Sequence, residues 1–329
     1  MPAVGRGRRP VGSGVPVVAL GGGHGLAVTL RALRGVTDQL TAIVGMADDG
    51  GSSGRLRREI GVPPPGDLRM ALAALCGDDV WGRTWSSVVQ HRFHSGELSG
   101  HALGNLLITA LWEQSGDLVD GLDWVGALLG ARGRVLPVTR AGLDIVAEVR
   151  DLPDEPGTVV VRGQHEVAVT PGTVVGIALD PPDPPACAEA VAAIETAGAV
   201  VMGPGSWYTS VMSSLMVPGI RAAVCAAEAH RVLVLNLVAQ PGETAGFSPQ
   251  SHLHVMAAAF PDLRFDVVLA DPRHVPDELL LREACALLGA SLVLRPIAAA
   301  GAEPGHHDPL LLGRAFGELI GHGSIPAWR

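Results

Sequence analysis

Residues 46–55, MADDGGSSGR, combine two kinds of group that bind ligands of opposite charge. Asp48 and Asp49 carry negative charge, whereas the glycines and serines that follow them are typical of a backbone that wraps an anion. A nucleotide diphosphate offers both hydroxyl groups and phosphates. We therefore predict that the two acids bind ribose hydroxyls or a divalent metal, and that the glycine-serine run binds phosphate. The alternative is a solvated turn in which a serine caps a helix.

The segment VVALGGGHGLAVTL, residues 17–30, has the pattern of a strand, a glycine loop and a helix. Gly21, Gly23 and Gly25 allow a tight turn and a close approach of ligand to backbone. The first N–H groups of the helix can then bind a phosphate. The loop is not the GxGxxG pattern, because its third glycine comes one residue early, so a plain strand-to-helix turn is the alternative.

Two later loops follow predicted strands in the same way. GPGSWYTS, residues 203–210, opens a helix, and the free amides of Gly205 and Ser206 can hold a phosphate. NLVAQPGET, residues 236–244, is a polar loop that can bind a base or a sugar. Because the carboxyl ends of parallel strands meet at one edge of a sheet, we expect these loops to share one site.

Two further places in the first half of the chain carry polar side chains that can reach a ligand. Asp67, in PPPGDLR, is either an acid at the start of a helix or a ligand for a metal or a hydroxyl. His101 and Asn105 are spaced to lie on one face of a helix. Their alternative role is in the core or in a cap.

We assign no catalytic residue from the sequence. No cofactor is assigned either, except that Mg²⁺ stays open as an alternative, with Asp48 and Asp49 as its candidate ligands. The residues predicted to bind the nucleotide are Gly21, Gly22, Gly23, His24, Gly25, Asp48, Asp49, Gly51, Ser52, Ser53, Asp67, Asn105, Gly203, Pro204, Gly205, Ser206, Tyr208, Thr209, Asn236, Gln240 and Glu243. We expect Asp48 and Asp49 to be exposed at the end of their strand.

The elements that must position these residues predict an α/β fold. Apolar runs that alternate with helical patterns favour a Rossmann-like, doubly wound, mostly parallel sheet. Its strands are predicted at 15–20, 41–46, 199–202, 232–235, 265–269 and 291–294, with a last helix at 309–320. Runs rich in valine and threonine predict a small antiparallel β patch at 135–138, 144–149, 158–161 and 173–179. We predict a disordered tail at 1–14 and a single domain at 15–329, with a helical insertion at about 67–130.

Composition excludes several classes of protein. The net charge is -9 over 329 residues, which argues against a general nucleic-acid binder. No run of 18 apolar residues predicts a membrane span. The four cysteines are far apart and lack CxxC spacing, which favours reduced thiols in a cytoplasm. The sequence has no lysine, and this excludes a Walker A lysine and a Schiff base.

Six of these segments together resemble one family. The segments GGGHGL, ADDGGSSGRLR, PPPGDLR, SGHALGNLL, GPGSWYTSV and QPGETAGFS have the order and spacing of the gluconeogenesis-factor (YvcK-like) proteins. Those proteins are related to the 2-phospho-L-lactate transferases (CofD-like) of coenzyme F420 synthesis. The resemblance covers nearly the whole chain, from about Val17 onward.

The resemblance implies a cytoplasmic homodimer with a Rossmann-like fold. It implies binding of a nucleotide sugar, UDP-N-acetylglucosamine, and a regulatory role in cell shape and envelope synthesis during growth on gluconeogenic carbon, through a protein partner that is not identified. The related transferases use a divalent metal to transfer a phospho-lactyl group. By that similarity, Asp48 or Asp49 and Asn105 are candidates to bind metal or phosphate.

This chain departs from the family pattern at two histidines. His24 stands where the first loop usually has threonine, and His306 stands where an arginine commonly precedes the His-Asp pair. We expect less positive charge near a phosphate at neutral pH. Two alternatives to the regulator stay open: a metal-dependent transferase that uses a nucleotide-diphosphate donor, and an NAD-dependent dehydrogenase. Against the dehydrogenase, this sequence lacks the GxGxxG pattern and shows no paired acid and base for catalysis.

Overall fold

The central sheet carries the predicted ligand loops. The computed structural model describes residues 14–153, 155–301 and 305–320, so most of the predicted tail at 1–14 lies outside the described residues. Seven strands, all paired in parallel, lie in the order β10-β9-β8-β7-β1-β2-β3. They are β1 (Val17–Gly21), β2 (Leu40–Val44), β3 (Arg134–Pro137), β7 (Ala199–Met202), β8 (His230–Val234), β9 (Val267–Ala270) and β10 (Ser291–Leu294).

The inner strands are apolar along their whole length because helices cover both faces of the sheet. Every residue of β1, β7 and β9 is buried. Strand order runs outward from β1 in one direction and from β7 in the other, so the chain reverses direction across the sheet between these two strands. This is the doubly wound α/β arrangement that the sequence predicted, and the fold class is confirmed.

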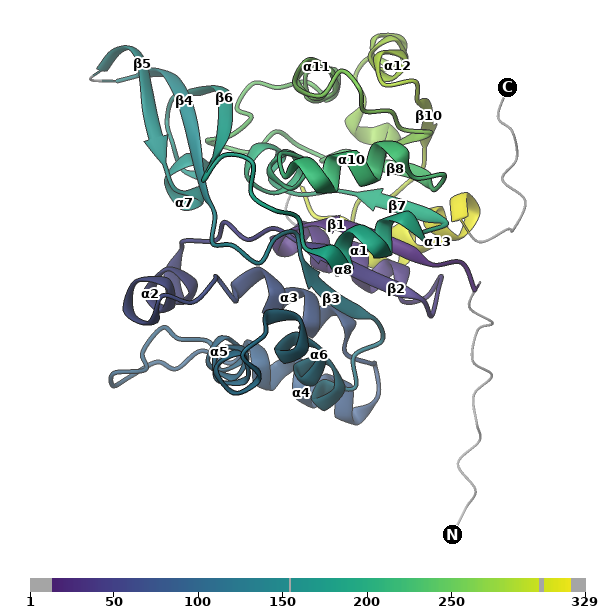
Figure 1. Ribbon diagram of the computed structural model, residues 1–329. Helices are drawn as coiled ribbons and strands as arrows, with labels where there is room; N and C mark the ends of the chain where they lie inside the picture. The colour runs from purple at the N-terminus through teal and green to yellow at the C-terminus, as the bar shows by residue number, and fades with distance from the viewer. Residues whose placement is uncertain (1–13, 154, 302–304, 321–329) are drawn as a thin grey trace.

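Helices connect the parallel strands through right-handed crossovers. Because the strand order runs in opposite directions from β1 and from β7, the connecting helices of the two halves lie on opposite faces of the sheet. On one face, α1 packs against α3 and α13. On the other, α8 packs against α10, and α11 packs against α12 (Figure 1). The helices outside the insertion are α1 (Gly23–Leu33), α7 (Gln164–Ala168), α8 (Ala188–Glu195), α9 (Ser213–Leu215), α10 (Pro218–Ala226), α11 (Pro249–Ala259), α12 (Glu278–Leu287) and α13 (Pro309–Ile320), with a π-helix η1 (Trp207–Met212) and a 3-10 helix η2 (Pro272–His274).

A block of five helices fills the connection between β2 and β3 (Figure 1). They are α2 (Gly51–Ile60), α3 (Gly66–Leu75), α4 (Val80–Gln90), α5 (Leu103–Ser115) and α6 (Leu118–Leu129). The first of them begins before Asp67, directly after the paired acids. Asp79 caps α4 and Asp117 caps α6 through side-chain oxygens that accept backbone N–H groups.

The small antiparallel sheet has three strands in the order β5-β4-β6 and projects from one side of the molecule beside α7 (Gln164–Ala168) (Figure 1). Its strands are β4 (Asp144–Leu152), β5 (Glu155–Arg162) and β6 (Thr173–Asp180). The prediction that 135–138 joins this patch is wrong. That run forms β3, which pairs in parallel with β2 at the edge of the main sheet, because the helical block returns the chain there.

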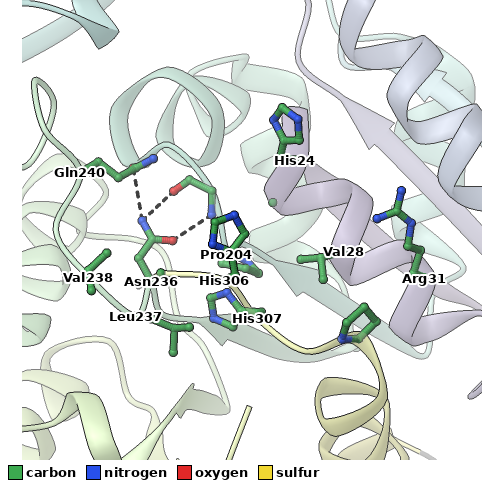
Figure 2. A pocket seen from close by; sticks show the side chains of 14 residues that line it. His24, Val28, Arg31, Pro204, Asn236, Leu237, Val238, Gln240, His306 and His307 are labelled. Atoms are coloured by element: carbon green, nitrogen blue, oxygen red, sulfur yellow. Dashed lines mark hydrogen bonds between the residues drawn. The ribbon is translucent and has the colours of Figure 1, made fainter. Parts of the chain in front are cut away.

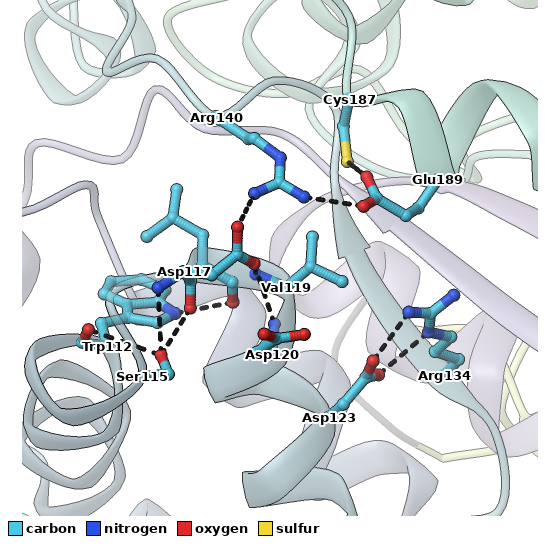
Figure 3. Close-up of polar contacts among 11 residues, drawn as sticks. Trp112, Ser115, Asp117, Val119, Asp120, Asp123, Arg134, Arg140, Cys187 and Glu189 are labelled. Atoms are coloured by element: carbon cyan, nitrogen blue, oxygen red, sulfur yellow. Dashed lines mark hydrogen bonds and ion pairs between the residues drawn. The ribbon is translucent and has the colours of Figure 1, made fainter.

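One arginine joins the helical block to the opposite side of β3. Arg140 donates to Asp117 at the start of α6 and to Glu189 in the first turn of α8, the second at 2.7 Å (Figure 3). The Cys187 thiol donates to the same glutamate. Arg134 forms a two-pronged pair with Asp123 nearby, at 2.9 and 2.7 Å. Through Arg140, these contacts link the start of α6 to the first turn of α8.

In the described part of the chain no single helix is long and apolar enough to cross a membrane. The bent pair 207–215 and 218–226 meets such a test by length and composition only, with 73° between its halves.

Candidate functional site

The larger of two polar cavities lies at the carboxyl ends of β1, β7 and β8. Register places the last residues of these strands side by side, so the loops that follow them meet. The cavity has a volume of about 410 Å³. The described residues that line it are His24, Gly25, Val28, Arg31, Pro204, Gly205, Asn236, Leu237, Val238, Gln240, Gly305, His306, His307 and Pro309 (Figure 2).

Direct backbone contact between two glycine loops forms the floor of this cavity. A Cβ atom at Gly25 would overlap the carbonyl group of Pro204, so only glycine fits there. The hydroxyl of Thr29 donates to the carbonyl of Gly203 at 2.9 Å, which joins α1 to the second loop. The glycine in the first loop is therefore needed for packing, whether or not a ligand is bound.

Asn236 holds the second loop in place. Its amide accepts from the N–H of Gly205 at 2.9 Å and donates to the carbonyl of the same residue at 2.8 Å (Figure 2). Gln240 accepts a longer bond from Asn236 at 3.3 Å and donates to the hydroxyl of Ser206 at 3.3 Å. The loop after β8 thus orders the loop after β7, while the outer parts of both amides line the cavity.

The opposite wall is one face of α1. His24, Val28 and Arg31 have the spacing i, i+4 and i+7, which places them in a row along a helix (Figure 2). His24 and Arg31 are exposed, and Val28 is half-buried. This row gives the cavity an apolar middle with a basic side chain at each end.

The described lining of the larger cavity contains one permanent cation, Arg31, and no carboxylate. Burial lowers the pKa of His307 to about 4, so this ring is neutral at pH 7. Its Nε2 lies 3.2 Å from the carbonyl of Leu235, which can only accept, so that nitrogen carries the proton. This balance of charge suits an anionic ligand that also has polar, uncharged parts.

A second, smaller cavity of about 230 Å³ lies on the other side of His24, which lines both. Four helices begin at or beside its wall, namely α1, α2, α3 and α5. The N–H groups of a first helical turn lack partners within the helix and carry partial positive charge. The lining residues are Gly23, His24, Asp48, Gly50, Gly51, Ser52, Ser53, Gly66, Asp67, Arg69, Met70, Arg92 and Asn105.

Two carboxyl groups face this smaller cavity. Asp48 accepts from the N–H of Gly50 at 3.1 Å. Burial of the Asp67 carboxyl, together with the charge of Asp48, raises the pKa of Asp67 to about 7, although the N–H of Gly23 and the charge of Arg69 oppose the shift. Near neutral pH the Asp67 carboxyl is therefore close to half protonated.

Two buried polar groups in the same wall lack partners among the described residues. The side-chain oxygen of Asn105 accepts no hydrogen bond, although the residue is only 1% exposed. Nε and Nη1 of Arg69 donate none, and that residue is only 4% exposed. Buried polar atoms without partners are rare in folded proteins, so both side chains keep unused hydrogen-bonding capacity beside the cavity.

The structure does not bring Tyr208, Thr209 and Glu243 into the lining of either polar cavity. Glu243 is buried and accepts from the N–H groups of Tyr208 and Thr209 at 2.9 and 3.3 Å, and from the hydroxyl of Thr209. Burial raises the pKa of Glu243, and these bonds oppose the rise. The carboxylate holds the start of η1, where helix N–H groups have no other partners.

Two expectations about the first half of the chain change in the structure. Asp48 and Asp49 are half-buried instead of exposed, and Asp49 accepts from the N–H of His165 at 2.8 Å outside the smaller cavity. His101 does not share a helix face with Asn105, because α5 begins at Leu103. Its ring instead bonds to the hydroxyl of Ser52 at 3.0 Å.

Several lining residues were absent from the prediction. Arg31 and Val28 were detectable from their helical spacing to His24. His306, which the family resemblance placed near a phosphate, does line the larger cavity. Arg69 lies two residues after Asp67, but nothing in the sequence shows that its side chain is buried. No motif in the sequence around Arg92 indicates a ligand site, and only the tertiary structure places this residue in the cavity wall.

A third cavity, of about 620 Å³, lies away from these loops between β6, η1 and α11. Most of the residues that line it have apolar side chains, and Asp183 and Arg221 are the charged residues described there. Nowhere in the described ranges do three or more His, Cys, Asp or Glu residues form a group that could hold a metal ion. All four cysteines are free thiols, and three of them are buried.

Comparison with known proteins gives one family match. The family model of "2-phospho-L-lactate transferase CofD" matches residues 17–293. A Mycobacterium leprae protein named "Putative gluconeogenesis factor" is 50% identical over 310 residues, covering 93% of this chain and 86% of that protein. The "Gluconeogenesis factor" of Bacillus subtilis is 38% identical over 266 residues, covering 80% and 81%.

A solved structure shares the fold. The crystal structure of a UPF0052 family protein from Bacillus halodurans aligns with a TM-score of 0.81 at 32% identity, covering 92% of this chain and 98% of that one.

Proposed function

The chain belongs to the family of the 2-phospho-L-lactate transferase CofD, and from that premise we propose that it binds a nucleotide sugar, UDP-N-acetylglucosamine, without converting it. The observation that carries the proposal is the larger cavity, where two glycine loops and α1 meet a polar loop at the ends of β1, β7 and β8. In a doubly wound sheet, this reversal point is where nucleotides bind.

Each wall of the cavity has a part in the proposed binding. The first-turn amides of α1 at His24 and Gly25 and the cation Arg31 contact the diphosphate. Asn236 and Gln240 present amide groups that can bond to a base or to sugar hydroxyls. Val28 and Leu237 supply apolar contact for a flat ring.

The same proposal gives the chain a regulatory role. Ligand binding would bias a surface that an envelope-synthesis protein recognises, and so link cell shape to gluconeogenic growth. The relatives named as gluconeogenesis factors support the growth condition. We place the protein in the cytoplasm as a homodimer, in keeping with its four free thiols and with the family.

Calorimetric titration tests the proposal. The purified protein is titrated with UDP-N-acetylglucosamine, UDP, GDP and NAD, with and without Mg²⁺, and the ligand is then recovered and analysed. Selective binding of the intact UDP-sugar supports the proposal. Failure of every nucleotide to bind overturns it.

A matched pair of variants locates the binding site. Arg31→Gln removes the cation of the larger cavity and should weaken binding of the UDP-sugar about tenfold, because a charge-assisted hydrogen bond is lost. Arg58→Gln removes an exposed arginine of α2 outside both cavities and should leave affinity unchanged. Equal affinities of the two variants would place the ligand elsewhere.

A metal-dependent transferase is the second candidate, and the smaller cavity favours it. Asp48, Asp67 and the unpartnered oxygen of Asn105 are hard oxygen ligands of the kind that Mg²⁺ prefers, so the residues present fit the ion. Bound Mg²⁺ would supply stabilisation of the negative charge on a departing diphosphate. The protein's own contribution is to orient the donor, with α1 and its His24 between the two cavities.

Thermal unfolding with and without Mg²⁺ separates the two candidates without an activity assay. If Asp67 helps to hold the ion, Mg²⁺ should raise the unfolding temperature of the wild type at alkaline pH but not that of Asp67→Asn, because the ion stabilises the charged carboxylate. GDP binding that requires Mg²⁺, together with product formation, would favour the transferase over the regulator.

A further inference from the structure

One wall of the larger cavity lies on a segment that pairs with residues 297–299, just after β10. Ala298 and His307 form an antiparallel bridge. The N–H of Asp308 donates to the carbonyl of Ile297 at 2.8 Å. The position of His307 in the cavity wall therefore depends on the position of its partner segment.

Asp271 holds residues 297–299 in place. It directly follows β9, and its side chain is fully enclosed. Its carboxylate accepts from the N–H groups of Ile297 and Ala298, each at 2.8 Å. Arg273 donates to both carboxylate oxygens and, at 3.0 Å, to the carbonyl of Ala298. The buried carboxylate thus connects the ends of β9 and β10 to the cavity wall.

A second contact orients the ring of His307. Its Nε2 carries the ring proton and donates to the carbonyl of Leu235, directly after β8. The other ring nitrogen, Nδ1, therefore has a free lone pair and can only accept a hydrogen bond. Nδ1 bonds to no described residue and is not one of their fully enclosed polar atoms, so it is open to the cavity (Figure 2).

The surroundings of the ring keep it neutral. Burial lowers the pKa of His307 to about 4, and the charges of His274 and His306 act in the same direction, whereas the carbonyl of Leu235 and the charge of Asp271 oppose the shift. A neutral ring with an open lone pair binds a hydroxyl or an N–H group. It does not bind an ionised phosphate oxygen, because that oxygen is an acceptor as well.

We propose that His307 recognises a donor group of the ligand, a sugar hydroxyl or the N–H of a base, through Nδ1, and that Asp271 is the positioning residue that holds the ring there. The proposal rests on the nucleotide-sugar function proposed above and names the part of the ligand that lies beside this wall. The phosphates are left to Arg31 and the first turn of α1 on the opposite wall.

NMR of the ¹⁵N-labelled histidine rings in the full chain tests the acceptor. At neutral pH, the ring of His307 should carry a proton on Nε2 only. Saturating UDP-N-acetylglucosamine should shift the Nδ1 resonance upfield without protonating this nitrogen, because it accepts a hydrogen bond, whereas inorganic diphosphate should not shift it.

Calorimetry with histidine variants tests the same contact. His307→Ala assigns the resonances and should weaken binding of the UDP-sugar about tenfold, because a hydrogen bond inside a cavity is lost. His254→Ala, which removes an exposed histidine of α11 outside the cavity, is the matched control and should bind as the wild type does.

Two further variants test the positioning role. Asp271→Asn removes the charge of the carboxylate, and Arg273→Gln removes a guanidinium group that is half exposed, so the second change spares the core. Both should weaken binding of the UDP-sugar about threefold to tenfold and should shift the His307 ring resonances of the free protein. Arg282→Gln, at an exposed position of α12 outside the cavity, should change neither.

The outcomes separate this proposal from the function on which it rests. If no UDP-sugar binds the wild type, the function is refuted, and the recognition role of His307 is refuted with it. If the UDP-sugar binds but Nδ1 does not shift, or if diphosphate protonates the ring, the function is retained and the role of His307 is overturned. If the His307 resonances of Asp271→Asn and Arg273→Gln match those of Arg282→Gln, Asp271 does not position the ring.

Discussion

Replacing Asp67 by asparagine should change how the stability of the protein depends on pH. The pKa of Asp67 rises from 3.8 to about 7 in the folded chain, because its carboxyl is enclosed and lies near the charge of Asp48. The folded state therefore binds more protons than the unfolded state between these two values. The free energy of unfolding falls as pH rises through this window, and asparagine removes that fall.

The expected size follows from the shift. One pKa unit corresponds to about 1.4 kcal/mol, so the full effect of the shift has an upper limit of about 4 kcal/mol. Between about pH 5 and about pH 8, the wild type should lose about 2 to 3 kcal/mol more than Asp67→Asn does. At about pH 4 and below, the carboxyl is protonated in the folded state, and the two proteins should differ least.

Urea unfolding of both proteins across this pH range measures the effect, since the difference between them cancels the other titrating groups. Asp38→Asn, which removes an exposed carboxylate from the loop before β2, is the matched control. A difference between the wild type and Asp67→Asn that stays constant with pH would show that Asp67 is not held in an unfavourable charged state. The electrostatic description of the smaller cavity would then be wrong.

Three other substitutions test the packing around the site by urea unfolding. Gly25→Ala should destabilise the protein by about 3 kcal/mol or more and abolish nucleotide binding, because the added Cβ overlaps the backbone of Pro204. Its control is Gly317→Ala in α13, where the added Cβ meets open space and should stabilise the protein by up to about 1 kcal/mol. Asp271→Asn should cost about 2 to 4 kcal/mol at neutral pH, because the buried carboxylate accepts five hydrogen bonds. Arg140→Gln should cost about 1 kcal/mol, because its two ion pairs are partly exposed.

For each of these substitutions, one result would contradict the expected change in stability. Wild-type stability in Gly25→Ala would mean that the two glycine loops can separate freely. Burial alone would raise the pKa of Asp271, but its hydrogen bonds hold it well below the usual range, so the difference between wild type and Asp271→Asn should vanish in strong acid. A difference that persists there would refute the role given to its charge. A loss of several kcal/mol in Arg140→Gln would contradict the small value expected of exposed pairs.

Local patterns in the sequence determined most of the secondary structure and the fold class. β7 and β10 were predicted with the bounds that the structure has, as was α13. The reason is that buried parallel strands need unbroken apolar runs, and an amphipathic helix needs its own period, so both leave a mark within a few residues. The glycine loops left a similar mark, because a tight turn after a strand needs residues without a side chain.

Pairing between distant segments could not be determined in this way. The valine-rich run that forms β3 has the composition of the antiparallel strands that follow it, and only the length and path of the helical block bring it beside β2. The sequence also showed that Glu243 is polar and lies after a strand. It could not show that the carboxylate turns toward η1, because its partners are 34 and 35 residues away along the chain.

The division of the site into two cavities was decided by tertiary structure alone. From the sequence, Asp48, Asp67 and the glycine loops were predicted to lie near one ligand, because of their residue types and their positions after predicted strands. Burial left two nitrogens of Arg69 without a partner among the described residues, and it raised the pKa of Asp67. Both effects depend on how many atoms from distant helices exclude water from a group, and no local pattern of residues contains that quantity.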